Sequence, residues 1–112
     1  AHLREIMLNL LVNAREAAGK GGQVTVSCQA SRNYMIELRI KDSGPGVPKD
    51  QREQIFEAYF TTKEKGTGLG LAIVKQNTEL YGGKIRMESE LGKGTEFILT
   101  FPTRTLLQDS LS

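Results

Sequence analysis

The 112-residue sequence predicts an α+β domain, a two-layer sandwich with three helices on one face of an antiparallel or mixed sheet. Three observations lead to this prediction. Apolar residues recur at helical spacing in two segments, and they alternate with polar residues in four others that form two hairpins. Glycine-rich breaks separate these segments. The length suits one domain that buries a core without disulfides.

Apolar stripes followed by glycine stops mark the long predicted helices. Leu3–Ala18 carries a nearly continuous stripe, which ends at Gly19–Gly22. Leu69–Tyr81 carries two adjoining stripes, which end at Gly82-Gly83. Between the two hairpins, Lys49–Ala58 is predicted as a short helix that contains two large apolar residues, Ile55 and Phe56.

Alternation of apolar and polar residues predicts four strands. Val24–Ala30 and Tyr34–Ile40 alternate on either side of a short polar connection and form the first hairpin. The second hairpin begins with Ile85 and Met87 and returns through Phe97–Phe101. Each strand therefore has one apolar face, which we expect to be at least half-buried against the helices.

Composition and charge exclude several classes of protein. Fifteen Lys and Arg against thirteen Asp and Glu give a net charge of +2, which does not indicate a nucleic-acid or membrane-surface partner. No apolar run approaches the roughly 18 residues of a transmembrane helix. The single cysteine, Cys28, excludes an internal disulfide and a zinc cluster, and is compatible with a reducing compartment. The single histidine, His2, argues against a Ser–His–Asp triad.

Two asparagines in the first helix suggest a functional face. Asn9 and Asn13 are four residues apart and project from one side, about 6 Å apart along the axis. Asparagine is a poor residue for a helix interior, so two in register suggest a use. The alternative is a solvated polar stripe, which Glu5 and Glu16 would complete.

An acid and a threonine continue the apolar faces of two strands. Asp42 has the parity of the apolar residues before it, and Thr95 has the parity of those after it, so both should point at the helix layer. A carboxylate on the core side costs free energy unless a donor meets it. The alternative is that the strand has ended and that Asp42 only caps the turn before Gly44.

One glycine cluster follows this acid, and a second precedes the last long helix. Asp42–Val47 closes one turn, and Gly66–Leu71 comes directly before the helix. Exposed amides at a helix N-terminus suit a phosphate, and Lys63 and Lys65 stand just upstream. A dinucleotide-binding fingerprint needs a preceding apolar strand, which is absent, and no P-loop occurs.

Five segments, in order, are similar to the sequence boxes of the ATP-binding catalytic domain of sensor histidine kinases, within the gyrase/Hsp90/histidine kinase/MutL superfamily. They are the asparagine box in Leu8–Ala14, the first glycine box in Asp42–Val47, the phenylalanine box in Ile55–Lys63, the second glycine box in Gly66–Val74 and the final glycine box in Gly92–Phe97. The resemblance extends from Leu3 to Phe101. Each box alone is weak, but all five in this order and spacing are specific.

The resemblance implies a Bergerat-type fold that holds ATP and Mg²⁺ between the sheet and the helices. By analogy, Asn13 would coordinate Mg²⁺, Asn9 would face the same region, and Asp42 would accept the adenine amine with Thr95 assisting. The other nucleotide contacts implied are Gly44, Gly46 and Val47 around the base, Thr61, Thr62 and Lys63 in a lid, and Gly66, Thr67, Gly68, Leu69, Gly70 and Leu71 around the phosphates. Asn9, Asn13 and Lys63 are the catalytic residues implied.

Two departures refine the resemblance. Many sensor kinases carry a lysine three residues after the magnesium asparagine, and this chain has Glu16 there. With the short Phe60–Lys63 lid, this looks like the nitrogen-regulation type, in which Lys63 would replace the missing contact. The phosphoacceptor histidine of the family lies on a separate helix pair, so His2 is interpreted as a surface residue. The chain is therefore expected to be a trimmed domain (residues 1–102, with a tail over 103–112).

The resemblance implies transfer of the γ-phosphoryl group of ATP to a histidine of a separate dimerisation domain, with a response regulator as an indirect partner. The domain is expected to be cytoplasmic and monomeric, to bind no nucleic acid and to make no membrane contact. The alternatives are a serine kinase or ATPase of the same superfamily and an inactive nucleotide-sensing module. Exposed apolar residues, among them Tyr59, Phe60 and Ile98, are expected to form a docking patch in any of these proteins.

Overall fold

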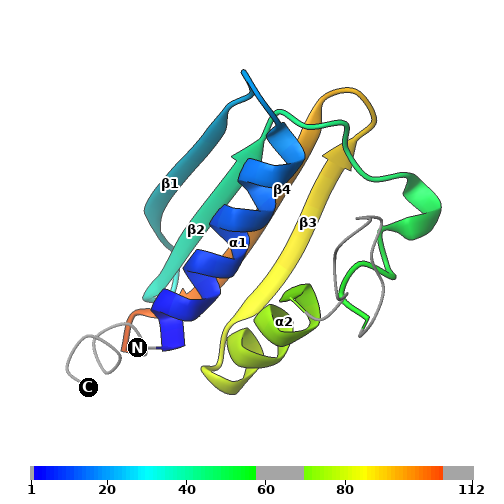
Figure 1. Cartoon of the computed structure of the whole chain (residues 1–112). Coiled ribbons are helices and arrows are strands. Elements are labelled where there is room, and N and C mark those ends of the chain that lie inside the picture. Colours follow the sequence, from blue (N-terminus) through cyan, green and yellow to red (C-terminus); the bar gives the residue numbers. More distant parts are fainter. Residues whose placement is uncertain (1, 58–69, 105–112) are drawn as a thin grey trace.

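The computed structural model describes residues 2–57 and 70–104 and has the predicted α+β architecture (Figure 1). The elements in chain order are α1 (His2–Ala18), β1 (Val24–Ser31), β2 (Met35–Asp42), the 3₁₀ turn η1 (Lys49–Gln51), α2 (Gly70–Leu80), β3 (Lys84–Glu90) and β4 (Gly94–Pro102). The four strands form one sheet in the order β1-β2-β4-β3, and every neighbouring pair is antiparallel. Figure 1 shows α1 and α2 on the same face of this sheet.

The core lies between α1, α2 and the two central strands. Ile6, Leu10 and Ala14 recur every fourth residue along α1 and are all buried, as the apolar stripe predicts. The other buried apolar residues of the cluster are Ile40, Ile55, Val74, Phe97, Leu99 and Phe101. Neither helix of residues 2–57 and 70–104 is both long and apolar enough to cross a membrane.

The predicted third helix, over Lys49–Ala58, is wrong. Only η1 forms, and the chain then continues through turns closed by i→i+3 hydrogen bonds, from Gln54 N to Gln51 O at 3.0 Å and from Glu57 N to Gln54 O at 2.9 Å. Ala58 lies outside the described part of the chain.

The reason for this error is the small apolar content of the segment. Ile55 is 7% exposed and lies in the core, and the ring of Phe56 packs edge-on against Phe97 with 6.0 Å between centroids. Two adjacent anchors do not form a stripe at helical spacing, so nothing favours a longer helix over turns. The described residues therefore contain two α-helices.

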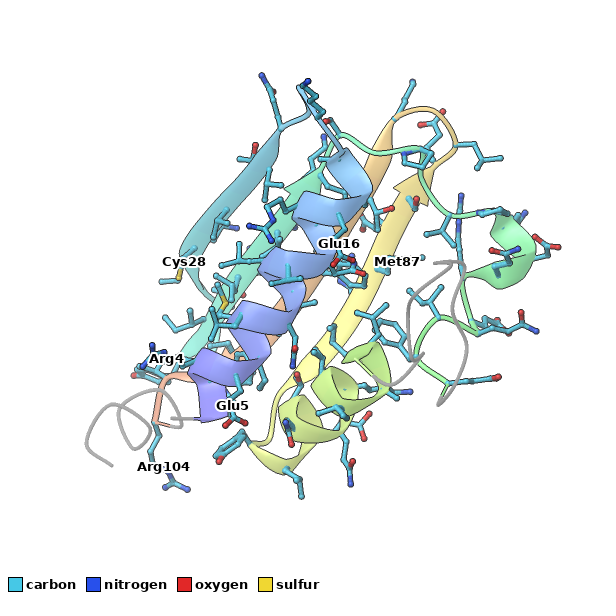
Figure 2. All side chains as sticks on the ribbon, in the orientation of Figure 1. Arg4, Glu5, Glu16, Cys28, Met87 and Arg104 are labelled. Carbon is cyan, nitrogen blue, oxygen red and sulfur yellow. The ribbon has the colours of Figure 1, made fainter. Side chains whose placement is uncertain are left out.

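The prediction that β1 is half-buried is also wrong. All eight residues of β1 are exposed, and Val26 retains 46% of its accessible surface. Because β1 is an edge strand and α1 lies over the centre of the sheet, its inward face is not covered (Figure 1). Figure 2 shows Cys28 at this open edge.

The opposite face of the sheet carries a charged layer with one buried apolar residue. Ile98 is 1% exposed, and its cross-strand partners are Arg39 and Arg86. The guanidinium group of Arg39 pairs with Glu96 at 2.9 Å and with Glu37 at 3.0 Å. Long paired side chains cover apolar neighbours with their stems. The prediction that Ile98 belongs to an exposed docking patch is therefore wrong. The other two residues of the predicted patch, Tyr59 and Phe60, lie outside the described residues.

We expect Ile98→Ala to lower the free energy of unfolding by about 2–4 kcal/mol, because it removes a buried side chain from beneath the charged layer. Ile73→Ala is the matched control, since Ile73 on α2 is 43% exposed, and its effect should be within about 0.5 kcal/mol. Urea unfolding of both variants measures the difference. Equal small effects would mean that the charged layer does not seal Ile98.

Candidate functional site

One row of paired residues crosses the sheet at the end where α1 terminates (Figure 1). Asp42, the last residue of β2, has Val24 as its partner on β1 and Thr95 as its partner on β4. Thr95 in turn has Ser89 of β3 as its partner. Directly paired residues share a face, so this row aligns an acid and two hydroxyls on the helix side of the sheet.

The carboxyl group of Asp42 is buried and bound by backbone amides. Asp42 is 2% exposed, and its Oδ1 accepts a hydrogen bond from the N–H of Gly44 at 2.8 Å. Burial raises the pKa of Asp42, while the hydrogen bonds from the N–H groups of Gly44 and Thr95 oppose that rise. The two readings of this residue are therefore compatible, because Asp42 faces inward and also caps its turn. The chain itself therefore supplies donors to this carboxyl group.

Glycines let the segment after Asp42 pack directly against the β3–β4 turn. A Cβ on Gly94, which has φ +101°, would lie 1.9 Å from the carbonyl oxygen of Asp42. A Cβ on Gly46, which has φ +80°, would lie 2.5 Å from the carbonyl oxygen of Glu90. The N–H of Gly92 donates to the Pro45 carbonyl at 2.9 Å. The loop over residues 43–48 is thus held by backbone contacts that no side chain could share.

The other side of this loop packs against α1. A Cβ on Gly44 would lie 2.5 Å from the carbonyl oxygen of Ala17. Ser43 is tied to the start of the first hairpin, because its hydroxyl accepts from the N–H of Gln23 at 2.8 Å and its own N–H donates to Gln23 O at 3.0 Å. The loop that follows the buried acid is therefore fixed at three places, namely α1, the residue before β1 and the β3–β4 turn.

The asparagine pair lies on the flank of α1. Asn13 is half-buried beside the core stripe, whereas Asn9 is exposed one turn earlier. Figure 2 shows Glu16 on the side of α1 that faces β3. Helical spacing puts both asparagines on this same side of the helix, away from β1. The polar stripe thus borders the space between α1 and the half of the sheet that α2 covers.

The predicted phosphate segment is described only at its end. Gly70 is exposed at the first turn of α2, and Leu71 is half-buried and packs against the core. The other candidate residues, Thr61, Thr62, Lys63, Gly66, Thr67, Gly68 and Leu69, lie outside the described residues.

Comparison with known proteins decides the family. Residues 1–105 match the family of histidine kinase-, DNA gyrase B- and HSP90-like ATPases. The chain belongs to this family.

The relatives of this ATPase domain are sensor histidine kinases. The sensor histidine kinase ZraS of Salmonella typhi is 43% identical over 96% of this chain, and sporulation kinase D of Bacillus subtilis is 39% identical over 90%. The chain spans 23% and 20% of the length of these two proteins. It therefore corresponds to the ATPase domain found within sensor histidine kinases.

Solved structures of similar sequence share the fold. The mycobacterial sensor histidine kinase MprB superposes with a TM-score of 0.83 at 36% identity, covering 90% of this chain and 70% of the other. Full-length ShkA, solved in complex with AMPPNP, superposes with a TM-score of 0.82 at 39% identity, covering 90% of this chain and 21% of ShkA. The two-layer sandwich is thus that of histidine kinase ATPase domains.

Sequence reasoning missed one polar residue of this candidate site. The hydroxyl of Ser89 accepts from the N–H of Val47 at 2.8 Å and lies 3.1 Å from the hydroxyl of Thr95. The signal was available, because Ser89 continues the apolar alternation of Ile85 and Met87 as Asp42 continues that of β2. It was overlooked because a serine in a strand carries no penalty that demands an explanation.

We expect Gly94→Ala to destabilise the domain more than Gly92→Ala. Both glycines have positive φ, +101° and +82°, but only a Cβ on Gly94 meets the backbone of Asp42. Backbone strain should cost each variant about 1–2 kcal/mol, and overpacking should cost Gly94→Ala about 1–3 kcal/mol more. Urea unfolding of the pair tests this, and equal losses would show that the loop is not pressed against the strand.

Asp42→Asn should change how the free energy of unfolding depends on pH. Because the pKa of Asp42 is raised in the folded state, the folded chain binds more protons than the unfolded chain above the unfolded pKa of about 3.9. Wild-type stability should therefore fall as pH rises through the window between that value and the raised pKa. The asparagine variant should lack this fall.

Urea unfolding between pH 3.5 and 7 (about the range in which carboxylates titrate) measures the two profiles. Asp50→Asn, at an exposed residue of η1, is the control and should keep the wild-type profile. Superimposable profiles of wild type and Asp42→Asn would contradict the burial argument.

Proposed function

We propose that this chain is the catalytic domain of a sensor histidine kinase that binds Mg·ATP and transfers its γ-phosphoryl group to a histidine on a separate dimerisation domain. In this reaction the bond between the γ-phosphorus and the β,γ-bridging oxygen breaks, a bond from phosphorus to an imidazole nitrogen forms, and ADP leaves. The observation that carries the proposal is the buried carboxyl group of Asp42 in a chain of this ATPase family.

At the base end, Asp42 would accept a hydrogen bond from the exocyclic amine of adenine, and Thr95 would assist. A buried carboxylate is costly even with amide donors, and an amine of a bound purine lowers that cost further. Gly44, Gly46 and Val47 would line the base, since their loop is held beside the acid. A purine fits here because its amine adds a hydrogen-bond donor to the buried carboxyl group of Asp42.

At the phosphate end, Asn13 would hold Mg²⁺ with phosphate oxygens and water, and Asn9 would face the same ion. Within residues 2–57 and 70–104 no group of three or more His, Cys, Asp or Glu could hold a metal. This suits Mg²⁺, which binds few protein ligands when phosphates and water complete its shell. When bound, the ion neutralises the charge that develops on the phosphates.

The remaining contacts are predictions that come from the sequence alone. The amides of Gly66–Leu71 would wrap the phosphates, with Thr61 and Thr62 beside them. Many sensor kinases have a lysine at the position of Glu16. Lys63 would supply that positive charge here, as in kinases of the nitrogen-regulation type. The domain would cover residues 1–102, with 103–112 as a tail.

The proposal also covers the partners of the domain. The helix pair that bears the phosphoacceptor histidine would be its direct partner, and a response regulator would receive the phosphoryl group next. ZraS and sporulation kinase D, both several times longer than this chain, support a multidomain parent. We place this domain of the parent in the cytoplasm, where ATP is available.

Calorimetry with ADP and with ATP, with and without Mg²⁺, tests nucleotide binding. Asp42→Asn and Asn13→Ala should each weaken binding by about 10- to 100-fold, because each removes a contact to a charged or strongly polar group. Only Asn13→Ala should reduce the dependence on Mg²⁺. Gln76→Ala, at an exposed residue of α2, should bind as the wild type does.

Mixing the domain with a phosphoacceptor helix pair and [γ-³²P]ATP tests the transfer. An acid-labile, alkali-stable product indicates a phosphohistidine, whereas an acid-stable product would indicate a serine kinase. Nucleotide binding without any transfer would favour a sensing module, and absence of nucleotide binding would refute the proposal.

A further inference from the structure

A nucleotide bound as proposed must run along the last turns of α1. The loop after Asp42 meets this helix at Ala17, because a Cβ on Gly44 would lie 2.5 Å from the carbonyl oxygen of Ala17. Asn13 lies four residues before Ala17, about 6 Å along the helix axis. A ligand with its base at Asp42 and its metal ion at Asn13 would therefore pass the stretch of α1 between Asn13 and Ala17.

Glu16 lies in this stretch and on the side of the site. It follows Asn13 by three residues, which puts the two side chains on one side of the helix with their Cβ atoms about 5–6 Å apart. Figure 2 shows Glu16 on the side of α1 that faces β3. Glu16 is exposed, so its carboxylate is accessible from solvent. The carboxylate therefore borders the path of the phosphates, next to the amide of Asn13.

The arginines of α1 point away from this path. At about 100° per residue, Arg15 is about 200° and Arg4 about 180° around the helix from Asn13. Figure 2 shows Arg4 on the side of α1 toward β1, whereas Glu16 is on the side toward β3. The helix therefore presents a negative charge, and no positive one, to the stretch between Asn13 and the loop.

The sheet adds no positive charge to the inner side of the site. Strand parity places every Lys and Arg of β2 and β3 on the outer face, and β4 contains none. These outward cations are Arg39, Lys41, Lys84 and Arg86. Lys75 of α2 lies 5.8 Å from the ring centroid of Phe56, and Arg52 donates from Nε to the Val47 carbonyl oxygen at 3.2 Å. On α1 and the four strands, the charges that face the site are thus carboxylates.

A carboxylate beside the phosphates acts differently on the two forms of a nucleotide. Metal-free ADP brings only negative charge to Glu16, and the two repel each other. Bound Mg²⁺ cancels part of the phosphate charge and is itself attracted by the carboxylate. Carboxylates together with phosphate oxygens are also the ligands that Mg²⁺ uses most often in nucleotide sites. The charge of Glu16 thus favours the magnesium complex over the free nucleotide.

We propose that Glu16 is a specificity-determining residue that makes nucleotide binding depend on Mg²⁺, by repelling metal-free phosphates and attracting the ion beside Asn13. The proposal rests on the proposed nucleotide function. Its measurable consequence is a coupling factor, the dissociation constant for ADP without Mg²⁺ divided by the dissociation constant with Mg²⁺. A residue that only supports the helix would change both constants equally and leave this factor unchanged.

Calorimetry of the 112-residue chain with ADP, in Mg²⁺ and in EDTA, measures the coupling factor. In Glu16→Gln this factor should fall about 5- to 20-fold, as expected when one charge about 6–8 Å from the phosphates is removed from a partly solvated site. Most of the fall should come from tighter binding of metal-free ADP. Salt is kept at about 0.1 M, where the Debye length of about 10 Å exceeds that spacing.

Two variants and one ligand serve as controls. Glu16→Asp keeps the charge and should retain most of the wild-type coupling factor. Glu88→Gln removes the same charge from the outer face of β3, the strand that Glu16 faces, and should leave the factor unchanged. Adenosine carries no phosphate, so wild type and Glu16→Gln should bind it equally in an NMR titration. Because Glu16 is exposed, its variants should fold as the wild type does.

An unchanged coupling factor in Glu16→Gln, with wild-type binding of Mg·ADP, overturns the inference and leaves the proposed function intact. Weaker binding of metal-free ADP by Glu16→Gln also overturns it, because Glu16 would then hold a positive group against the phosphates. A change in adenosine binding of the same size would show that the charge does not act through the phosphates, and overturns it as well. A wild-type chain that binds no ADP overturns the proposed function and the inference together.

Discussion

The burial of one carboxyl group at the end of β2 is the constraint on which this end of the sandwich depends. Asp42 lies at 2% exposure, where an ionised group is stable only if donors surround it. The chain supplies backbone N–H groups, from Gly44 at 2.8 Å and from Thr95. To bring these donors close, the loop must turn back at once and pack against the β3–β4 turn, and only glycine permits that approach at Gly94. The burial of the acid thus requires the glycines that let the loop and the turn approach it.

Much of this arrangement could be predicted from the sequence, because strand parity is strict. Side chains alternate with a period of two, so a polar residue that continues an apolar series must share its face. That argument placed Asp42 and Thr95 on the inner side, and both are buried. The same argument applies to Ser89, and it was not followed because a serine fits either face of a strand. Hydrogen-bond partners as distant as Val47, 42 residues away, cannot be read from alternation.

The errors in the fold have a common physical origin. Periodicity shows which face of an element is apolar, but coverage depends on where the other elements lie. β1 alternates as a half-buried strand does, yet it lies at the edge beyond α1 and is exposed. Ile98 has the parity of the outer face, yet Arg39 and its partners cover it. The segment after η1 has two apolar anchors and too few others to favour a helix over turns.

The placement of the polar row Asp42–Thr95–Ser89 follows from the register of the sheet. These residues are paired across three strands, and the next pairs in the same register are Ile40 with Phe97 and Phe97 with Met87, which include core side chains. A slip of one residue would turn the polar row outward, but it would also expel the core from the sandwich. The hydrophobic core therefore fixes the side of the sheet on which the acid and the two hydroxyls lie. The stability of the whole fold thus keeps the three polar groups in place.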